Sequence, residues 1–413
     1  MKFQIIYGMF LLLIAIYDIA DSKQYDWPMK IKEGLTSTFC EYRDGHFHAG
    51  VDFKTWDREG IPVYSVDSGS IYKLRASPWG YGKAIYVLHN DSTFAIYAHL
   101  SGFAPKLDST VLRTQKKRNR YTITKVFKRG EIIVKRGELI GFSGSTGIGA
   151  PHLHFELRDK NECPVNPLEN GILINDSQNP VPKYIMFRPL NFNSKVNCSR
   201  SVFISKIIRE KNRSRTGTKI REFTIKDRIV IDGQAGLGIS VIDLAYGLSN
   251  RLCIYKARLF FNDSLVYSSR YSKFCYSNTH QIGLDRDISL IREGKGRFHR
   301  LWVSRENRLK FYKPDTAFSG VIYVLNKDSN SVPSLDTHRI RIEVEDFNGN
   351  RAVIKFPVFF DSAYTCDKSP DTAVIPDDSC GFILSNLFGR LEMNLTCGSN
   401  MKKPPSVTII YED

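Results

Sequence analysis

The chain has 413 residues, of which 42% are hydrophobic and 12% aromatic; this composition is typical of a globular protein and not of a disordered one. That length accommodates two or three domains, each with its own core. Lysine and arginine outnumber aspartate and glutamate by 59 to 43, giving a formal net charge of +16, so the surface is basic and favours acidic partners.

The first 22 residues have the pattern of a secretory signal peptide. Lys2 supplies a short positive region, an apolar run extends from about Met9 to Tyr17, and Ala20-Asp21-Ser22 has the small residues of a cleavage site. No other segment approaches the roughly 20 apolar residues of a membrane-spanning helix. We therefore expect an exported protein without a stable membrane span in its mature chain, located in the periplasm, the cell envelope or the extracellular medium. A retained N-terminal anchor is the alternative.

Export restricts the classes of acidic molecule that a basic surface can meet. Cell-wall polymers, anionic lipids and glycans are acidic partners outside the cell, whereas nucleic acid is not expected because no recognition motif accompanies the charge. Eight cysteines follow the signal, an even number that permits disulfides without fixing their connectivity. No C-x-x-C pair is present, so a cysteine-based zinc cluster is not expected.

Residues 23–180 are predicted to form a mostly antiparallel sheet domain. GSIYKL, AIYVLH and TFAIYAHL are strand-like runs that turns at Gly80–Gly82 and Asn90-Asp91 separate. Residues 104–136 interrupt these runs with eleven lysines or arginines against two acidic residues, most densely in QKKRNR. We interpret this stretch as a solvated insertion between strands, and the alternative is a rim that attracts an anionic wall polymer or substrate.

A change of composition at NPVPKYIMFRP predicts a domain boundary near residue 180. Residues 181–362 again have the pattern of strands, most clearly in HRIRIEVEDFNGNRAVIKFPVFF, where apolar and charged residues alternate on both sides of an Asn-Gly turn. Several such runs without a helical stretch predict an Ig-like β-sandwich, so the whole chain is assigned to the all-β class. GQAGLG (233–238) opens no helix and is predicted to be a turn. Residues 363–413 form a short cysteine-containing tail, interpreted as the start of a further sandwich repeat.

The segment GAPHLHFELR (149–158) places two histidines one residue apart. Side chains alternate in a strand, so one face carries His152, His154 and Glu156 while the other is apolar. The polar face then has three groups that bind metals or transfer protons. H-x-H alone is also compatible with a half-buried strand whose polar face meets solvent, so the motif needs partners elsewhere in the chain.

Such partners lie upstream in FHAGVDF, where His48 and Asp52 are four residues apart. An extended chain would separate them by about 13 Å, whereas two ligands of one zinc ion lie within about 4 Å of each other. Both can bind one ion only if the chain bends, and Gly50 is the expected hinge. Together with one histidine of H-x-H they would form a two-histidine, one-carboxylate site with an open fourth position. The other histidine of the pair and His99, in IYAHLSG, would face that position.

Two further patterns limit the chemistry of this site. No H-E-x-x-H is present, so proton transfer is expected from histidines and not from a glutamate on a zinc-binding helix. GFSGSTGIG (141–149) lacks the G-K-[ST] of a phosphate-binding loop, and we interpret it as a wall that approaches the histidine strand closely.

Taken together, these segments resemble the lysostaphin/LytM-type zinc metallopeptidases. HFHAGVDF, AIYAHLSGF, KRGELIGFSGSTGIGAPHLHFELRD and NPL follow the order and spacing of the family's motifs over about residues 35–170. The resemblance implies that His48, Asp52 and His154 bind one zinc ion per chain and that His99 and His152 are catalytic. It also implies hydrolysis of peptide bonds in bacterial peptidoglycan. The alternatives are a LytM-like regulator that has lost its metal and a wall-binding protein whose sandwich carries the function.

Two features depart from the family pattern. Cys40 stands where a small residue such as glycine is expected, and the basic insertion after His99 is longer than the family core needs. Neither departure removes a ligand. His46 and His89 match no functional position, so we expect them to be surface or packing residues.

Overall fold

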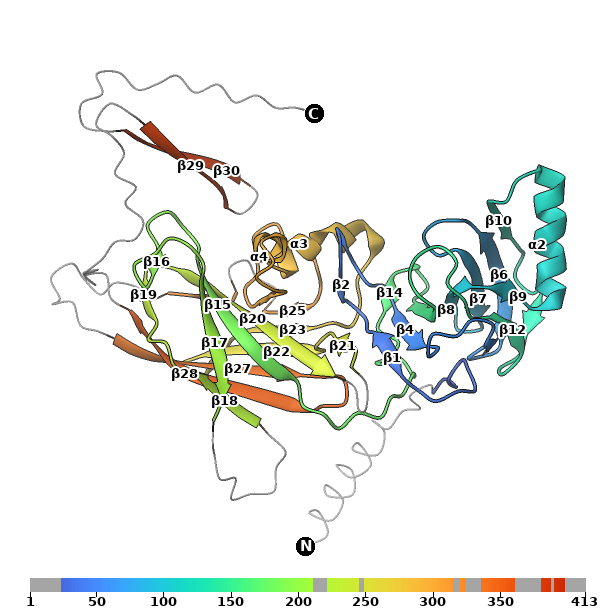
Figure 1. The fold of residues 1–413 in the computed structure, drawn as a ribbon, viewed down its shortest axis with the longest axis horizontal. Coiled ribbons are helices and arrows are strands. Elements are labelled where there is room, and N and C mark those ends of the chain that lie inside the picture. Colours follow the sequence, from blue (N-terminus) through green and yellow to red (C-terminus); the bar gives the residue numbers. More distant parts are fainter. Residues whose placement is uncertain are drawn as a thin grey trace, which may run out of the picture.

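The computed structural model describes residues 24–210, 221–244, 249–314, 319–323 and 336–360, and two further strands, β29 (Cys380–Leu387) and β30 (Arg390–Cys397). The predicted signal peptide and most of the predicted tail lie outside these residues. Two lobes lie side by side along the long axis (Figure 1), which we call the N-terminal lobe (residues 24–180) and the C-terminal lobe (residues 181–360). Within the described part of the chain, no helix has both the length and the apolar character needed to cross a membrane.

The N-terminal lobe is built on an antiparallel sheet of nine strands. The main path is β1 (Leu35–Ser37), β4 (Val51–Lys54), β13 (His152–Arg158), β8 (Phe94–Leu100), β7 (Lys83–His89), β6 (Gly69–Ala76) and β10 (Ile123–Val126), with β11 (Ile133–Val134) beside β6 and β14 (Pro164–Val165) beside β13. A smaller sheet contains β5 (Pro62–Tyr64), β12 (Leu139–Phe142) and β9 (Gly102–Phe103), and a hairpin contains β2 (Tyr42–Arg43) and β3 (His46–Phe47). The strands predicted from GSIYKL, AIYVLH and TFAIYAHL are β6, β7 and β8, which confirms the all-β class.

Strand β13 lies in the middle of the large sheet with its two faces in different surroundings. Leu153 and Phe155 are fully buried in the apolar core of the lobe, which also contains Phe53 of β4 and Tyr97 of β8. Because side chains alternate along a strand, the histidines of β13 are directed to the opposite face. That face is where the candidate site forms.

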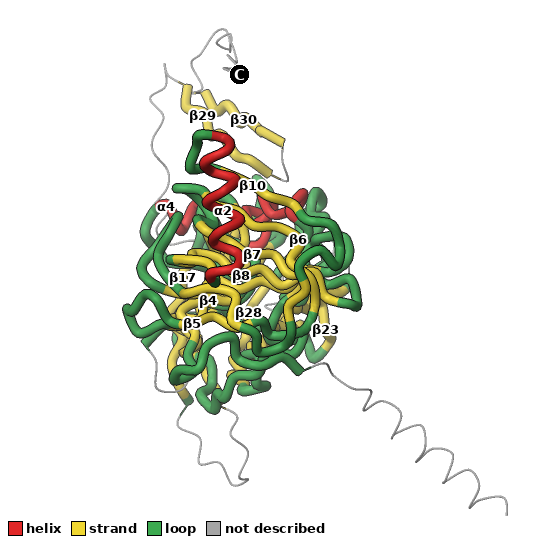
Figure 2. The backbone as a smooth tube through the Cα atoms, turned by 90° about the vertical axis from the view of Figure 1, so that its right-hand side faces the viewer, coloured by secondary structure: helices red, strands yellow, loops and turns green. Residues whose placement is uncertain are grey.

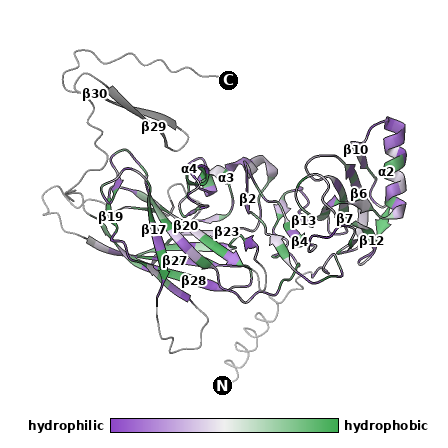
Figure 3. Cartoon of the chain, in the orientation of Figure 1, coloured by the Kyte–Doolittle hydropathy of each residue, from purple (hydrophilic) through white to green (hydrophobic). Residues whose placement is uncertain are grey.

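The basic stretch 104–136 contains a helix that was not predicted. Helix α2 (Pro105–Arg118) lies at the outer end of the N-terminal lobe, on the side away from the C-terminal lobe (Figures 1 and 2). It buries only Leu107 and Val111, and polar and apolar residues mix along it (Figure 3), so the apolar stripe is too short to reveal a helical period. The basic residues of its last turn are exposed, in agreement with a solvated insertion.

The C-terminal lobe contains a sheet of fourteen strands. Its main path is β21 (Arg251–Leu252), β20 (Ala235–Leu244), β15 (Val181–Pro189), β17 (Phe203–Arg209), β18 (Arg221–Ile225), β28 (Arg351–Phe360), β27 (Asp336–Glu345), β22 (Lys256–Phe261), β23 (Ser264–Arg270) and β25 (Tyr312–Lys313). Off this path lie β16 (Lys195–Val196), β19 (Val230–Asp232), β24 (His299–Arg300) and β26 (Val321–Ile322), and the short helices are η1 (Tyr276–Gln281), α3 (Ile282–Asp285) and α4 (Ile288–Arg292). The lobe is rich in strands as predicted, while the Ig-like sandwich and the boundary near residue 180 stay predictions.

The hairpin predicted in this lobe is confirmed, and the predicted turn at 233–238 is partly wrong. Strands β27 and β28 pair in one continuous antiparallel register from Asp336 with Phe360 to Glu345 with Arg351. At the predicted turn, however, β20 already begins at Ala235. Gly238 lies inside that strand. A Cβ at this position would come within 2.3 Å of the side chain of Met186, so close packing and not turn formation explains this glycine.

The two lobes share packing and a covalent bond at their junction. Phe39 and Phe47 of the N-terminal lobe belong to the apolar core of the C-terminal lobe, and each ring centroid lies 5.4 Å from that of Phe274. Cys163 and Cys275 form a disulfide between the lobes, which settles one of the pairings that the sequence left open. The junction therefore holds the segment around Phe274 and Cys275 beside the sheet that carries β13.

Candidate metal centre

Strands β4 and β13 pair in a register that sets Asp52 directly opposite His154. Directly opposed residues of antiparallel strands project from the same face, so the two side chains meet, with 2.8 Å between Asp52 Oδ1 and His154 Nδ1. Gly50 permits this approach, because a Cβ at this position would lie 2.0 Å from the carbonyl oxygen of Phe155. We had expected Gly50 as a hinge, and the structure shows that the close contact with β13 requires it.

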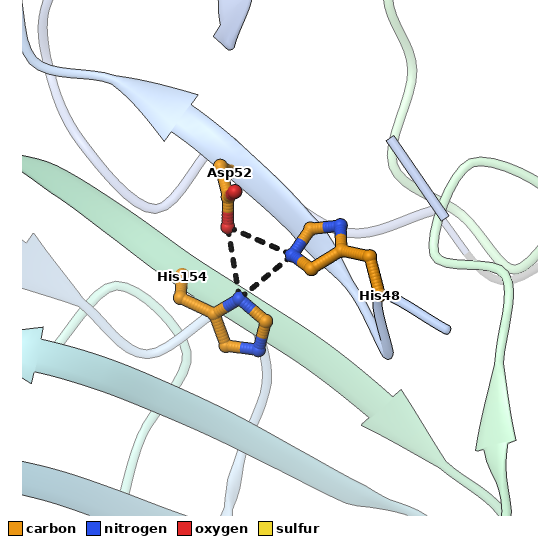
Figure 4. Close-up of side chains that lie close together, drawn as sticks. All are labelled: His48, Asp52 and His154. Atoms are coloured by element: carbon orange, nitrogen blue, oxygen red, sulfur yellow. Dashed lines mark hydrogen bonds and ion pairs between the residues drawn. The ribbon is translucent and has the colours of Figure 1, made fainter. Parts of the chain in front are cut away.

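His48 completes a triangle of candidate ligand atoms. It precedes β4, and the chain bends so that His48 Nε2 lies 3.0 Å from Asp52 Oδ1 and 3.0 Å from His154 Nδ1 (Figure 4). All three residues are buried. The predicted bend between His48 and Asp52 is confirmed, and the H-x-x-x-D and H-x-H segments meet at one point.

The other nitrogens of the two imidazoles have acceptors of their own. His48 Nδ1 donates to the carbonyl oxygen of Thr38 at 2.8 Å, and His154 Nε2 donates to Glu156 Oε1 at 2.9 Å. In a neutral imidazole the nitrogen without the proton is an acceptor. Two acceptor nitrogens and a carboxylate oxygen therefore converge, and such a set is stable only with a positive charge among them.

The pKa values of His154 and Asp52 in the protein without a metal ion also indicate that a positive charge belongs at this point. Burial lowers the pKa of His154, but hydrogen bonds with Asp52 and Glu156 outweigh it and raise the pKa to about 9. Burial raises the pKa of Asp52, but the charges of His48 and His154 and their hydrogen bonds hold this pKa well below its usual range. A proton or a metal ion thus belongs beside Asp52.

Zinc fits this set of donors. Two imidazole nitrogens and one carboxylate oxygen are ligands of catalytic zinc sites, which leave a fourth position for water. Ligands about 2 Å from one ion are only a few tenths of an ångström further apart than these three atoms, so a small outward movement of the side chains accommodates the ion. Thr38 and Glu156 fix which nitrogen of His48 and of His154 faces the ion, as outer partners do in zinc sites.

His99 and His152 lie beside the triangle. Their ring centroids are 4.7 Å apart, and His152 Nε2 is 3.7 Å from Asp52 Oδ1. His99 donates its Nδ1 proton to the carbonyl oxygen of Thr146 at 2.9 Å, and His152 donates to that of Ala150 at 2.7 Å. Each ring therefore has Nε2 as its acceptor nitrogen.

Burial keeps both of these histidines neutral at pH 7. Burial, followed by the charges of His154 and His152, lowers the pKa of His99 to about 4. Burial also lowers the pKa of His152, against the opposing effect of Asp52. Neutral imidazoles with a free Nε2 are suited to accept a proton.

The glycine-rich segment 141–149 closely approaches the histidine strand, as its sequence predicted, because the backbone nitrogen of His152 donates to the carbonyl oxygen of Gly144 at 3.1 Å. A Cβ on Gly144 would lie 2.5 Å from the backbone nitrogen of Ser101, and one on Gly147, whose φ is +92°, would lie 2.2 Å from the carbonyl oxygen of Gly80. Thr146, between them, accepts the hydrogen bond of His99. The wall therefore orients one of the two flanking histidines.

A buried network behind His154 was not predicted as part of the site. Glu156 is fully buried and accepts hydrogen bonds from Tyr81, from Arg158 at 2.7 Å and from Tyr276 at 2.9 Å, in addition to that from His154. Burial raises the pKa of Glu156, but Arg158 and His154 outweigh it and lower the pKa to about 2. The sequence signal was the position of Glu156 on the histidine face of its strand, whereas no sequence pattern indicated Tyr276 of the C-terminal lobe.

Two more residues support the H-x-x-x-D segment. Arg43 Nη2 donates to Ser37 Oγ at 2.7 Å and lies 3.4 Å from Asp52 Oδ2, so it holds the second oxygen of that carboxylate. Cys40, where we had expected a small residue such as glycine, has a φ of +63°, a conformation that glycine adopts most easily. Its carbonyl oxygen accepts a hydrogen bond from Arg286 of the C-terminal lobe at 3.1 Å, which stabilises this conformation.

All five predicted site residues thus lie together. His46 is exposed and His89 is buried, and neither takes part in the cluster, as expected.

A family model described as Peptidase family M23 matches residues 46–116, a range that includes His48, Asp52 and His99. The chain is 33% identical over 122 residues to the DD-carboxypeptidase/endopeptidase Mpg of Neisseria meningitidis serogroup B, covering 29% of this chain and 22% of Mpg. It is 32% identical over 141 residues to lysostaphin of Staphylococcus staphylolyticus, covering 34% of this chain and 22% of lysostaphin. The matched part therefore spans about a fifth of the length of these two relatives.

A third relative is matched over most of its length. The chain is 30% identical over 109 residues to lipoprotein NlpD of Yersinia enterocolitica, covering 26% of this chain and 88% of that protein. Among solved structures, a zinc containing peptidase from Vibrio cholerae is 26% identical, with a TM-score of 0.28, and the match covers 37% of this chain and 41% of that chain. None of these similarities extends over more than 37% of the chain.

Proposed function

The chain belongs to peptidase family M23, and on that premise we propose that it is an exported zinc metalloendopeptidase that hydrolyses peptide bonds in bacterial peptidoglycan. The observation that carries the proposal is the convergence of two imidazole nitrogens and a carboxylate oxygen, with two further neutral histidines beside them. The resemblance to lysostaphin/LytM-type enzymes supports peptidoglycan as the substrate. The signal-peptide pattern of the first 22 residues supports export.

The ligand triangle would hold the metal ion through His48 Nε2, Asp52 Oδ1 and His154 Nδ1. When bound, zinc supplies Lewis-acid polarisation of the scissile carbonyl and brings the pKa of a coordinated water to about 7. The chain's own contribution is orientation, because Thr38 and Glu156 bind the outer nitrogens of the two imidazoles.

His99 and His152 would transfer protons at Nε2. Their Nδ1 atoms are engaged with backbone carbonyls, so Nε2 is the atom that accepts a proton from the attacking water and returns it to the leaving amine. The ring that carries the proton can donate a hydrogen bond to the oxyanion of the tetrahedral intermediate. Both rings have the same tautomer and lowered pKa values, so their geometry suits either role.

A regulator without catalytic activity is the alternative, and lipoprotein NlpD is a relative whose name states no peptidase activity. LytM-like regulators that have lost their metal typically lack several ligands. Here His48, Asp52 and His154 are present and grouped, with His99 and His152 beside them. This arrangement favours the peptidase.

The proposal is tested by incubating the purified mature chain with peptidoglycan and identifying released peptides by mass spectrometry. We expect release that a chelator abolishes and added zinc restores, and no release from His154→Ala. Peptides that appear equally with and without the chelator would contradict the role of zinc. No release from a zinc-loaded wild type on any peptidoglycan tested would favour the regulator.

A further inference from the structure

Three buried aspartates meet at a second point of the structure. Asp176 lies on the chain that leads out of the N-terminal lobe, Asp243 lies in β20, and Asp346 directly follows β27. Each offers a carboxylate oxygen, and these atoms lie within 4.8 Å of one another, although the residues are only 8%, 3% and 2% exposed. Three ionised carboxylates at this separation would repel one another, so the cluster favours a proton or a cation among them.

One oxygen atom of these carboxylates is buried without a hydrogen-bond partner. This atom is Asp243 Oδ1, whereas the same carboxyl group forms a backbone hydrogen bond with Leu244. Asp346, by contrast, accepts hydrogen bonds from the backbone and side-chain nitrogens of Asn350 at 2.9 and 2.6 Å. A buried polar atom without a partner is costly, so Asp243 Oδ1 indicates that a ligand belongs in the cluster.

The three aspartates line a cavity with a volume of about 20 Å³. That volume holds roughly one water-sized particle. Asn348 also lines the cavity, and because its Nδ2 donates to the carbonyl oxygen of Ile174 at 2.8 Å, its Oδ1 remains as a neutral oxygen donor. The cavity therefore combines room for a single ion with several oxygen ligands.

The donor set selects the class of ion. Carboxylate and amide oxygens without an imidazole are ligands of hard cations. The thiol of Cys253 also lines the cavity, but burial raises its pKa to about 12, so it is not a thiolate ligand. Magnesium usually keeps several of its waters, for which this cavity has no room, whereas calcium takes six to eight oxygens in irregular geometry.

We propose that Asp176, Asp243 and Asp346 bind one calcium ion, which fastens the chain leaving the N-terminal lobe to the C-terminal lobe. The hairpin turn after β27 already contacts that chain, because Asn350 Nδ2 donates to the carbonyl oxygen of Asp176 at 3.1 Å. Burial and the charges of Asp346 and Asp176 raise the pKa of Asp243 to about 8, so calcium would displace a proton from this carboxyl group at neutral pH. The site is separate from the zinc ligands and does not depend on the proposed peptidase activity.

The test is a calcium titration of the full mature chain, stripped of metal and reloaded with one equivalent of zinc. Calorimetry should find one calcium per chain, and the melting temperature should rise progressively with calcium concentration above Kd. Asp243→Asn should weaken calcium binding at least about tenfold, because it removes a charged ligand at constant size. Magnesium should bind the wild type more weakly than calcium does.

Two variants serve as controls. Asp263→Asn changes an aspartate that is 68% exposed in the same lobe, and its calcium response should equal that of the wild type. His154→Ala should lose zinc but keep calcium, which separates this site from the peptidase centre. If Asp243→Asn does not fold, Asp176→Asn is measured in its place. Calcium that binds neither tightly nor stoichiometrically, or that binds the aspartate-cluster variant as well as the wild type, would overturn the proposal.

Discussion

At His154 the nitrogen that faces the candidate ion is Nδ1, whereas His48 presents Nε2 to the same point. The difference follows from the acceptor of each ring. His48 donates to a backbone carbonyl through Nδ1, while His154 donates through Nε2 to Glu156, two residues further along the same face of β13. One carboxylate in the strand therefore sets the tautomer of one metal ligand.

The two histidines of H-x-H should fail differently when they are changed. His154→Ala should lose most of its zinc, because it removes a ligand atom of the triangle. His152→Ala and His99→Ala should keep zinc and the fold but lose turnover by about 10²- to 10⁴-fold, the usual contribution of a general acid or base. Elemental analysis for zinc and peptide release are measured on all three variants. Zinc lost from His152→Ala and retained in His154→Ala would reverse the two assignments.

At the residue scale the sequence contained most of the candidate site. The motif spacings supplied all five residues, and the strand pattern placed Glu156 on the correct face. Arg43 and Tyr276 could not be predicted, since their contacts with Asp52 and Glu156 arise only when separate segments pack.

At the scale of elements, the site depends on how closely β4 lies to β13. The register that opposes Asp52 to His154 sets the two ligands on one face, and the missing side chain of Gly50 permits the contact. The alternation of β13 was evident in the sequence. The pairing of β4 with β13, about a hundred residues apart, was implied only by the need of their side chains for one ion.

Gly50→Ala should therefore damage both stability and metal binding. Its Cβ would overlap the carbonyl oxygen of Phe155, so β4 must move away, at a cost of about 1–3 kcal/mol in the free energy of unfolding. The separation of Asp52 from His154 should also weaken zinc binding. Gly102→Ala is the control, because the nearest atom to its Cβ would be 3.9 Å away. Denaturant unfolding and zinc titration are the measurements, and a Gly50→Ala protein with wild-type zinc affinity would contradict this account.

Helix α2 could not be predicted from the periodicity of its apolar residues. Its ends carry ordinary helix signals, namely Pro105 in the first turn, basic residues in the last turn and Asn119 as a left-handed C-cap. Its apolar stripe consists of two residues, because only one narrow face touches the lobe. Periodicity could not reveal a helix that buries so little.

The exposed basic end of α2 allows the solvated-insertion interpretation to be tested. Neutral replacement of Lys116, Lys117, Arg118 and Arg120 should change the free energy of unfolding by no more than about 0.5 kcal/mol, since these side chains are exposed. On this interpretation, zinc content, turnover and the salt dependence of binding to wall fragments should equal those of the wild type. A clear loss of salt dependence in the variant would instead support attraction of an anionic wall polymer.

At the scale of the whole molecule, the C-terminal lobe forms part of the surroundings of the candidate centre. Tyr276 hydrogen-bonds Glu156, Thr279 Oγ1 accepts from the backbone nitrogen of Phe47 at 3.0 Å, and the Cys163–Cys275 disulfide lies directly beside Tyr276. The sequence predicted two strand-rich regions and a change of composition near residue 180. It could not predict that the second region packs against the residues that carry the ligands, because pairing between distant segments leaves no local pattern.

This arrangement predicts that residues 24–180 alone will not reproduce the candidate centre. Without the C-terminal lobe, Phe39 and Phe47 would be exposed, each at a cost of about 1.5–3 kcal/mol, and Glu156 would lose Tyr276. We expect the fragment to aggregate or to melt well below the full chain and to bind zinc weakly.

The full chain with Cys163→Ser and Cys275→Ser is the comparison, because it keeps the apolar contacts. It should lose only the disulfide contribution, typically about 2–4 kcal/mol, and retain its zinc. Thermal unfolding and zinc titration of the three proteins decide the matter, and a fragment that matches the full chain in both would show that the C-terminal lobe does not support the centre.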